Sequence, residues 1–353
     1  MPDLAPDPTH LDRRTLLKAG AAGVGGLAAG PLLAGAAEAA PTPRSILAKG
    51  LSIPWGLTFL PNGNALVAER EGTVWRVSRN GGKKAIGDVR RVVPAGEGGL
   101  LGLELHPDFA SNRWLYAYMT TASDNRVVRM KYADGRLGSQ HVVLAGIPKA
   151  GNHNGGRLRF GPDGMLYIST GDAGDSSNAQ NRRSLGGKIL RVTPTGGTPS
   201  GNPFGSSPVW TLGHRNVQGL SFDRRGRLYA TEFGQNTRDE LNRIVRGANY
   251  GWPIVEGGDG AGGKYRDPIT TWQPTSTCSP SGLAVVGNHG WVGALAGAAL
   301  FRVTLTGPRK GRKRRFLHDD FGRIRTVEQS PDGSLWITTS NGSGDRVIRV
   351  QLG

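Results

Sequence analysis

Hydrophobic and polar residues alternate along most of this chain in short runs, and the runs come in pairs joined by a tight turn. The third pair is the clearest, because residues 157–160 and 165–169 flank the turn Pro162-Asp163-Gly164. Side chains of a β-strand point to opposite faces in turn, and Asp-Gly or Asn-Gly provides the backbone angles of a hairpin turn. Each pair is therefore predicted to be a β-hairpin.

The same paired phrase occurs six times after the N-terminal region. Its anchor positions are 56, 102, 157, 219, 282 and 325, and the fifth copy is degraded. Further strand patterns follow several copies, such as residues 73–77 and 188–192. A four-stranded unit repeated about every 40–60 residues is typical of a β-propeller. We predict an all-β, six-bladed β-propeller with four-stranded antiparallel blades; a solenoid is the alternative, but the uneven spacing favours it less.

The ends of the chain carry two further predictions. A C-terminal strand at residues 345–350 is expected to complete a blade with the N-terminal strand and close the ring. Residues 1–39 combine Arg13-Arg14, a short run of small apolar residues and an Ala-x-Ala site at 37–39, which indicates a twin-arginine export signal. A membrane anchor is the alternative, and the run is short for one. Residues 40–353 are predicted to form a single catalytic propeller domain, periplasmic or extracellular, with no integral membrane segment in the mature chain.

Composition agrees with a turn-rich β protein and raises one question of charge. The 353 residues include 56 Gly and 22 Pro, and the single Cys278 excludes an intrachain disulfide. The formal net charge is +17, yet the basic residues are scattered except for the run 309–315, which contains no aromatic residue for base stacking. We interpret the run as a solvated loop and exclude nucleic acid; an anionic envelope surface or an acidic redox partner is the alternative.

Propeller geometry shows where to look for a site. The first strand of each blade lines the central channel, and the loops that enter these strands gather at one mouth. Four residues before each anchor stand Ser52, Gly98, His153, Arg215, Cys278 and Phe321. Glu97 and Arg323 lie beside two of these positions, so all these groups are expected to surround one polar funnel.

A histidine and a carboxylate are the first candidates for chemistry at this funnel. His153 lies among glycines and could act as a general base. Asp172 ends the hairpin of the same blade and could orient the imidazole. The alternatives are a surface-loop histidine and an aspartate that caps a turn.

Three arginines indicate the nature of a ligand. Arg215, followed by Asn216, precedes one channel strand, and Arg323 and Arg325 are expected to alternate on one face of another. Buried cations are costly without an anion, so three arginines directed at one funnel predict a polyanionic ligand. A structural contact at a blade corner is the alternative for Arg215.

The segment 233–240 has features of a weak calcium site. Gly234 leaves backbone carbonyls accessible, and carboxylates follow at Asp239 and Glu240. Oxygen ligands of this kind suit Ca²⁺, although the spacing matches no EF-hand loop. The aromatic turn 249–253 is interpreted as structural.

The assembled phrases resemble the PQQ-dependent soluble aldose (glucose/sorbosone-type) dehydrogenases, which are six-bladed propellers. The matching stretches are 98–109, 153–172, 213–222, 234–242 and 247–253, and the resemblance extends over nearly the whole mature chain. It implies oxidation of an aldose at C1 to the lactone, with PQQ and Ca²⁺ as cofactors and an external quinone, cytochrome or dye as electron acceptor.

The resemblance also implies roles for single residues. His153 is similar to the base that removes the C1 hydroxyl proton while hydride passes to C5 of PQQ, with Asp172 as its partner. Arg215 is similar to the arginine that polarises the C5 oxygen. The remaining implied contacts are Glu97, Asn216, Arg323 and Arg325 to PQQ, the carbonyls of Gly234 and Gln235 to the catalytic Ca²⁺, and Glu240 with the Tyr250 carbonyl to a second, structural Ca²⁺.

Two positions depart from the family pattern. Ala296 stands where a lysine is usual, and Glu97 stands where a glutamine commonly contacts the cofactor. Both changes remove positive or add negative charge near an expected polyanion, so PQQ affinity is expected to be weakened. They leave two alternatives open: a Ca²⁺-dependent propeller hydrolase of the lactonase kind, which the arginine-rich funnel disfavours, and a non-catalytic carbohydrate- or envelope-binding propeller that has lost PQQ.

Overall fold

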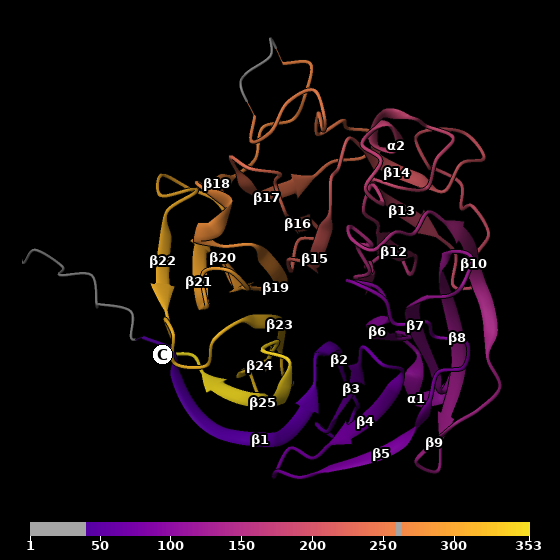
Figure 1. The fold of residues 1–353 in the computed structure, drawn as a ribbon, viewed down its shortest axis with the longest axis vertical. Helices are drawn as coiled ribbons and strands as arrows, with labels where there is room; N and C mark the ends of the chain where they lie inside the picture. Colours follow the sequence, from indigo (N-terminus) through magenta and orange to yellow (C-terminus); the bar gives the residue numbers. More distant parts are fainter. Residues whose placement is uncertain (1–39, 259–262) are drawn as a thin grey trace, which may run out of the picture. The chain divides into compact units, whose positions relative to one another are not determined.

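The computed structural model describes residues 40–258 and 263–353, and the expected export signal at 1–39 lies outside this part of the chain. Within the described part, six antiparallel sheets stand around a common centre, as in a propeller (Figure 1). Five of these sheets contain four strands in chain order, with one short strand added to the second sheet, and the sixth combines the last three described strands with the first. The predicted six-bladed fold is confirmed.

Blades 1 to 3 are formed by residues 54–212. From the channel outward, blade 1 contains β2 (Pro54–Phe59), β3 (Ala65–Glu69), β4 (Thr73–Val77) and β5 (Lys83–Asp88). Blade 2 contains β6 (Leu100–Leu105), β7 (Trp114–Thr120), β8 (Asn125–Ala133) and β10 (His141–Ile147), with β9 (Arg136–Leu137) beside β8. Blade 3 contains β11 (Leu158–Phe160), β12 (Leu166–Ser169), β13 (Lys188–Val192) and β14 (Val209–Leu212).

Blades 4 to 6 follow in the same way. Blade 4 contains β15 (Val217–Phe222), β16 (Leu228–Glu232), β17 (Asp239–Ile244) and β18 (Thr270–Trp272). Blade 5 contains β19 (Pro280–Val286), β20 (His289–Ala294), β21 (Ala299–Thr304) and β22 (Lys313–Phe316). Blade 6 contains β23 (Ile324–Gln329), β24 (Leu335–Thr339), β25 (Ser343–Gln351) and β1 (Thr42–Ser52). The helical segments of the described residues are short: α1 (Phe109–Asn112), α2 (Ser177–Gln180) and the 3₁₀ turn η1 (Thr275–Thr277).

The two ends of the described chain meet in blade 6. Strand β1 pairs antiparallel with β25, with Ile46 opposite Ile348, and supplies the outermost strand of that blade (Figure 1). A carboxylate oxygen of Asp345 accepts a hydrogen bond from the backbone N–H of Ile53 at 3.1 Å. The predicted closure of the ring by its two terminal strands is confirmed.

The repeated anchor positions explain how six inner strands fit around one channel. Inner strands of successive blades contact one another, and β23 contacts β2. A Cβ atom on Gly56 would lie 2.3 Å from the Leu101 carbonyl oxygen, and one on Gly219 would lie 2.4 Å from the Ser281 carbonyl oxygen. Glycine at these anchors is therefore required by the close approach of the neighbouring strand. The two arginine anchors, Arg157 and Arg325, are buried, and both guanidinium groups lie near the Trp55 ring.

Arg157 and a set of charged side chains are buried on the inner strands. The Arg157 guanidinium carbon lies 4.3 Å from the centre of the Trp55 ring. Two residues further along the strand, Arg159 binds Glu328 at 2.6 Å and Glu104 at 3.5 Å, joining blades 2, 3 and 6. Burial, reinforced by the nearby Glu328 and opposed by Arg159, raises the pKa of Glu104 to about 7. This buried ion network links the inner strands of three blades.

The basic run departs from its prediction in part. Its second half forms the start of β22, the exposed outermost strand of blade 5, and the predicted loop ends at Arg312. Positive charges on an edge strand oppose pairing with another sheet edge, which gives this run a structural reason. Among the described residues, no helix has the length and hydrophobicity that crossing a membrane requires.

Candidate functional site

The structure brings His153 and Asp172 into direct contact at the mouth of the channel. His153 lies in the loop before β11, and Asp172 lies just after β12, the antiparallel partner of β11. The imidazole Nδ1 is 2.7 Å from Oδ1 of Asp172. This bond fixes the ring and leaves Nε2 as the nitrogen that can accept a proton from a ligand.

The surroundings of Asp172 keep its carboxylate ionised. The group is almost wholly buried, and Oδ1 also accepts the Gly174 N–H at 2.9 Å, while Oδ2 accepts the indole N–H of Trp252 at 2.8 Å. Burial acts to raise the pKa of Asp172, but the bonds from His153, Trp252 and Gly174 outweigh it and hold the pKa below its usual value. The interpretation of Trp252 as purely structural was incomplete, because its indole completes the carboxylate's partners.

Glu97 holds the loop of His153 from the neighbouring blade. Its Oε2 accepts the backbone N–H of His153 at 2.9 Å and lies 3.4 Å from Nδ2 of Asn216. The Asn216 Oδ1 in turn accepts the Gly155 N–H at 3.0 Å. His153 has a φ of 54°, a left-handed conformation that is costly for most residues, and these bonds stabilise it. The carboxylate of Glu97 therefore has hydrogen-bond donors within this chain, the His153 N–H and the Asn216 side-chain amide.

Arg215 lies between carboxylates and the carbonyl of the next loop. Its Nη1 donates to the Gly234 carbonyl at 2.7 Å, and its guanidinium carbon lies 5.4 Å from the Trp252 ring centre. The Arg215 backbone N–H donates to Glu232. Burial lowers the pKa of Arg215, while four surrounding carboxylates act against that shift: Asp172, Glu232, Glu256 and Glu97.

Arg325 is buried, and Arg323 is exposed. The Arg325 Nη1 donates to Oε1 of Gln218 at 2.7 Å, and burial lowers the pKa of Arg325 to about 9. Arg323 precedes β23, and the pairing of β23 with β24 is irregular between Ile324 and Thr326. Because Arg323 stands just before the strand, its alternation with Arg325 on one strand face stays a prediction, and its charge acts to lower the pKa of Arg325.

Arg70 is a further cation at the mouth that the sequence patterns did not reveal. It follows the second strand of blade 1, and its charge acts to lower the pKa of Arg325, as does that of Arg157. Glu97 acts on both Arg215 and Arg325 in the opposite direction. Within the described part of the chain, the Nε atoms of Arg70, Arg215 and Arg325 are buried without a hydrogen-bond partner. Arg70 directly follows the second strand of its blade, so examining the residue after each second strand would have pointed to it.

The four expected metal ligands fall into two groups. Gly234 and Gln235 lie in the loop after β16, and the carboxylate of Glu256 organises this loop by accepting four successive backbone N–H groups, those of residues 235–238. Glu240 lies at the start of β17, where it is bonded to the Gly257 N–H and to Asn242. In the described ranges, no three His, Cys, Asp or Glu side chains form a metal-binding group.

The environment of the second group is acidic and aromatic. Burial raises the pKa of Glu240, and Glu232, its direct cross-strand neighbour, adds to the shift. The Tyr250 ring stacks on His214 at 4.6 Å, and His214 Nδ1 lies 2.8 Å from Glu232. Two buried carboxylates on neighbouring strands would be stabilised by a cation, which suits the expected structural Ca²⁺.

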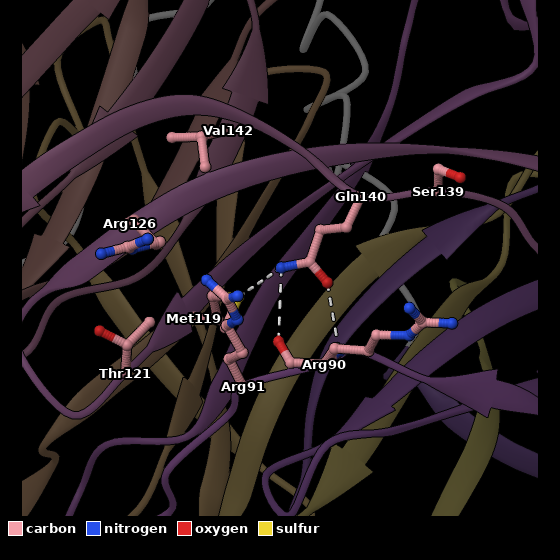
Figure 2. A pocket seen from close by; sticks show the side chains of 8 residues that line it. All are labelled: Arg90, Arg91, Met119, Thr121, Arg126, Ser139, Gln140 and Val142. Atoms are coloured by element: carbon pink, nitrogen blue, oxygen red, sulfur yellow. Dashed lines mark hydrogen bonds between the residues drawn. The ribbon is translucent and has the colours of Figure 1, made fainter.

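A surface pocket on blade 2 is lined by several arginines and contains neither a histidine nor a carboxylate, unlike the mouth of the channel. It has a volume of about 320 Å³, and Gln140 crosses it to bond the backbone of Arg90 (Figure 2). Arg126 in this pocket is paired with Asp124 at 2.7 Å. The full lining is Arg90, Arg91, Met119, Thr121, Arg126, Ser139, Gln140 and Val142, which includes no general base.

Comparisons with known proteins agree with this geometry. Residues 51–349 match the family model described as Glucose / Sorbosone dehydrogenase. The chain belongs to the glucose/sorbosone dehydrogenase family. It is 30% identical to an aldose sugar dehydrogenase of Escherichia coli K12, over 85% of this chain and 90% of the relative. Membership makes this protein a sugar oxidoreductase, as the resemblance implied.

Solved structures extend the likeness. The PQQ-bound aldose sugar dehydrogenase of Streptomyces coelicolor is 46% identical, with a TM-score of 0.84 over 88% of this chain and 98% of that one. The apo form of the soluble E. coli aldose sugar dehydrogenase is 29% identical, with a TM-score of 0.79 over 88% and 99% of the two chains. Both likenesses cover most of this chain and nearly the whole of the other.

In this family member the indole of Trp252 is expected to support catalysis through Asp172. Trp252→Phe removes the bond to Oδ2 and keeps a ring beside Arg215. A hydrogen bond to a charged group contributes about 1.5–3 kcal/mol, so kcat for sugar oxidation is expected to fall about 10-fold or more. Steady-state dye reduction measures this loss. Trp272→Phe is the matched control, because the Trp272 indole nitrogen is buried without a partner among the described residues; an equal loss of kcat in the control would contradict the role of Trp252.

Proposed function

We propose that this protein oxidises an aldose at C1 to the lactone, using PQQ as cofactor with Ca²⁺, and with His153 as the general base. The observation that carries the proposal is the pairing of the His153–Asp172 dyad with buried, unpartnered guanidinium nitrogens at one mouth. A dyad alone fits many reactions. A dyad beside several buried cations fits a reaction whose second participant is a polyanion.

The residues at the mouth fit PQQ, a tricarboxylate. Guanidinium groups bind carboxylates by paired hydrogen bonds, and the free Nε atoms of Arg215 and Arg325 provide donors that no described residue uses. Arg70 contributes a cation close to Arg325, which offsets the absence of a lysine at Ala296. Glu97 is engaged with the His153 N–H and Asn216, so its charge is partly satisfied within the protein.

The chain's own groups provide the acid–base part of the reaction. With Nδ1 bound to Asp172, the Nε2 of His153 accepts the proton of the C1 hydroxyl. The Asp172 carboxylate stabilises the imidazolium that results, and Trp252 holds that carboxylate in place. PQQ, when bound, supplies the electrophilic quinone carbon that takes the C1 hydride. Arg215 and Asn216 would hold it beside His153, and Arg323 and Arg325 would neutralise its carboxylates.

Ca²⁺ would be held at the carbonyls of Gly234 and Gln235. The Gly234 carbonyl accepts a hydrogen bond from the Arg215 guanidinium at 2.7 Å, and the second lone pair of this oxygen would remain for the metal ion. Glu240 and the Tyr250 carbonyl would form the second, structural site, beside the buried carboxylate of Glu232. The external electron acceptor and export through residues 1–39 belong to the same proposal.

Reconstitution tests the function. The purified apo protein is mixed with PQQ and Ca²⁺, and cofactor absorbance is recorded together with sugar-dependent dye reduction. We expect a spectral change at micromolar PQQ, turnover that requires PQQ, and loss of turnover when Ca²⁺ is chelated. Absence of a spectral change would overturn the proposal and favour a lactone hydrolase or a non-catalytic binding protein, which a lactone hydrolysis assay then separates.

A further inference from the structure

Lys188 is a fully buried lysine close to the active-site mouth. It is the first residue of β13, and its exposed fraction is 0%. Its ammonium donates to three backbone carbonyls: Asn178 at 2.6 Å, Gly186 at 2.7 Å and Ala179 at 3.1 Å. No ion pair among the described residues includes it. Three carbonyl oxygens thus surround a buried cation that has no carboxylate partner.

Burying the Lys188 ammonium costs free energy, and its three carbonyl contacts require a side chain with several N–H donors. Burial lowers the pKa of Lys188 to about 7, which shows how unfavourable the site is for a charge. The three carbonyls act against this shift, because only the ammonium form has three N–H donors. An apolar side chain at this position would avoid the cost of burial but would leave the three carbonyls without this donor.

The carbonyls that Lys188 binds belong to a segment that touches the active site at three points. Asn178 Nδ2 donates to the Asp172 carbonyl at 3.0 Å. The Ala179 carbonyl accepts the Gly213 N–H at 2.9 Å, just before His214 and Arg215. Gln180 Nε2 donates to the Trp252 carbonyl at 2.7 Å. The three consecutive residues of α2 therefore reach the segments that carry Asp172, Arg215 and Trp252.

The backbone of Lys188 fixes the other side of the same segment. The Lys188 carbonyl accepts the Thr170 N–H at 2.9 Å, and the neighbouring Gly187 N–H donates to the Gly171 carbonyl at 2.7 Å. One residue thus holds α2 through its side chain and the β12 end through its main chain. Asp172 lies between these two attachments.

We propose that Lys188 is a positioning residue for the His153–Asp172 dyad. Its ammonium fixes α2, and α2 fixes the segments around the dyad, so the carboxylate, Arg215 and the Trp252 indole keep their mutual geometry. Lys188 itself touches neither substrate nor cofactor. The effect on turnover rests on the proposed role of His153 as the base, whereas the effect on the geometry of the loop does not.

Lys188→Met tests this role, because methionine has a similar length and no donor. Displacement of catalytic groups by about 1 Å can cost up to 10²-fold, so we expect kcat to fall about 10- to 100-fold while the KM for sugar changes less than about threefold. In the PQQ-free protein, hydrogen exchange measured by mass spectrometry should become faster in residues 173–187 and at Gly213. Exchange in blades 1, 5 and 6 should stay as in the wild type.

Two further variants make the test decisive. Lys131→Met removes an exposed ammonium that also donates to a backbone carbonyl, that of Asn112, and it should change neither kcat nor exchange in 173–187. Asn178→Ala removes the link from α2 to Asp172 and leaves Lys188 in place. It should lower kcat in the same direction by a smaller factor, and it serves if Lys188→Met does not fold.

The outcomes separate this proposal from the proposed function. A folded Lys188→Met with wild-type kcat and wild-type exchange would overturn the positioning role, and so would an Asn178→Ala variant with unchanged kcat. Faster exchange in every blade, with an equal fall in PQQ binding, would also overturn it and indicate general destabilisation. An inactive wild type would refute the function, and the exchange data on the PQQ-free protein would still decide the role of Lys188.

Discussion

Replacing His153 by alanine is expected to lower kcat for aldose oxidation by two to four orders of magnitude and to leave PQQ binding within about threefold. A positioned general base typically contributes a factor of 10²–10⁴ to a rate, and the imidazole contributes no formal charge toward a polyanion when it is neutral. Turnover is measured by dye reduction with saturating PQQ and Ca²⁺. PQQ affinity is measured separately by titrating its absorbance.

The backbone at residue 153 requires a second variant. His153 has a φ of 54°, and asparagine tolerates this conformation better than alanine does. His153→Asn should therefore lose the same factor in kcat with a smaller change in stability. The exposed His318 provides the control, since His318→Ala should keep wild-type turnover. Retention of kcat in both His153 variants would exclude His153 as the base.

Replacing Arg325 by methionine is expected to weaken PQQ binding and to stabilise the apo protein. Removing one partner of a buried charge pair costs about 2–5 kcal/mol, which corresponds to a rise in the PQQ Kd of about 30- to 4,000-fold. The apo protein is expected to become more stable, because the substitution removes a cation whose burial is unfavourable. Gln218, which loses the Arg325 donor, still accepts from Ser281 at 3.0 Å.

The sign of the stability change follows from protonation. The folded pKa of Arg325 is about 9, below its value in the unfolded chain, so the unfolded state binds more protons between these values. The contribution of Arg325 to stability therefore rises with pH above about 9, and its full cost is present at pH 7. Thermal unfolding of the apo protein at pH 7 should show a higher Tm for Arg325→Met.

Arg323→Met is the matched control for Arg325, because Arg323 is exposed and lies two residues away. It should raise the Kd for PQQ by less than about 10-fold and leave the apo Tm unchanged, as expected for an exposed charge. Unchanged PQQ affinity in Arg325→Met would mean that the buried guanidinium does not face the cofactor. A lower apo Tm in that variant would mean that its hydrogen bonds outweigh its burial.

The architecture and the centre of the site could be predicted because both follow from a repeated local pattern. Gly56 and Gly219 mark equivalent points of two inner strands, and counting back from the anchors reached His153 and Arg215 on neighbouring blades. The end of a hairpin returns to its start, which placed Asp172 beside His153. These inferences need only the period of a strand and the geometry of a blade.

The remaining features depend on contacts that no local pattern encodes. Trp252 reaches Asp172 across 80 residues, and its phrase also suits a structural turn. Arg70 stands one strand outward from the register used, and Lys188 has the appearance of an ordinary residue in an outer strand. The irregular pairing of β23 with β24 between Ile324 and Thr326 likewise has no residue signature at that position.

The pairing of β1 with β25 has a consequence for biosynthesis. Of the described strands the ribosome makes β1 first and β25 last, with five blades between them, so the outer strand of blade 6 has no partner until residues 343–351 have emerged. The ring therefore cannot close blade by blade during translation, and β1 remains an unpaired strand for most of the synthesis. Closure therefore follows the synthesis of β25, and loss of that strand would leave β1 without its partner.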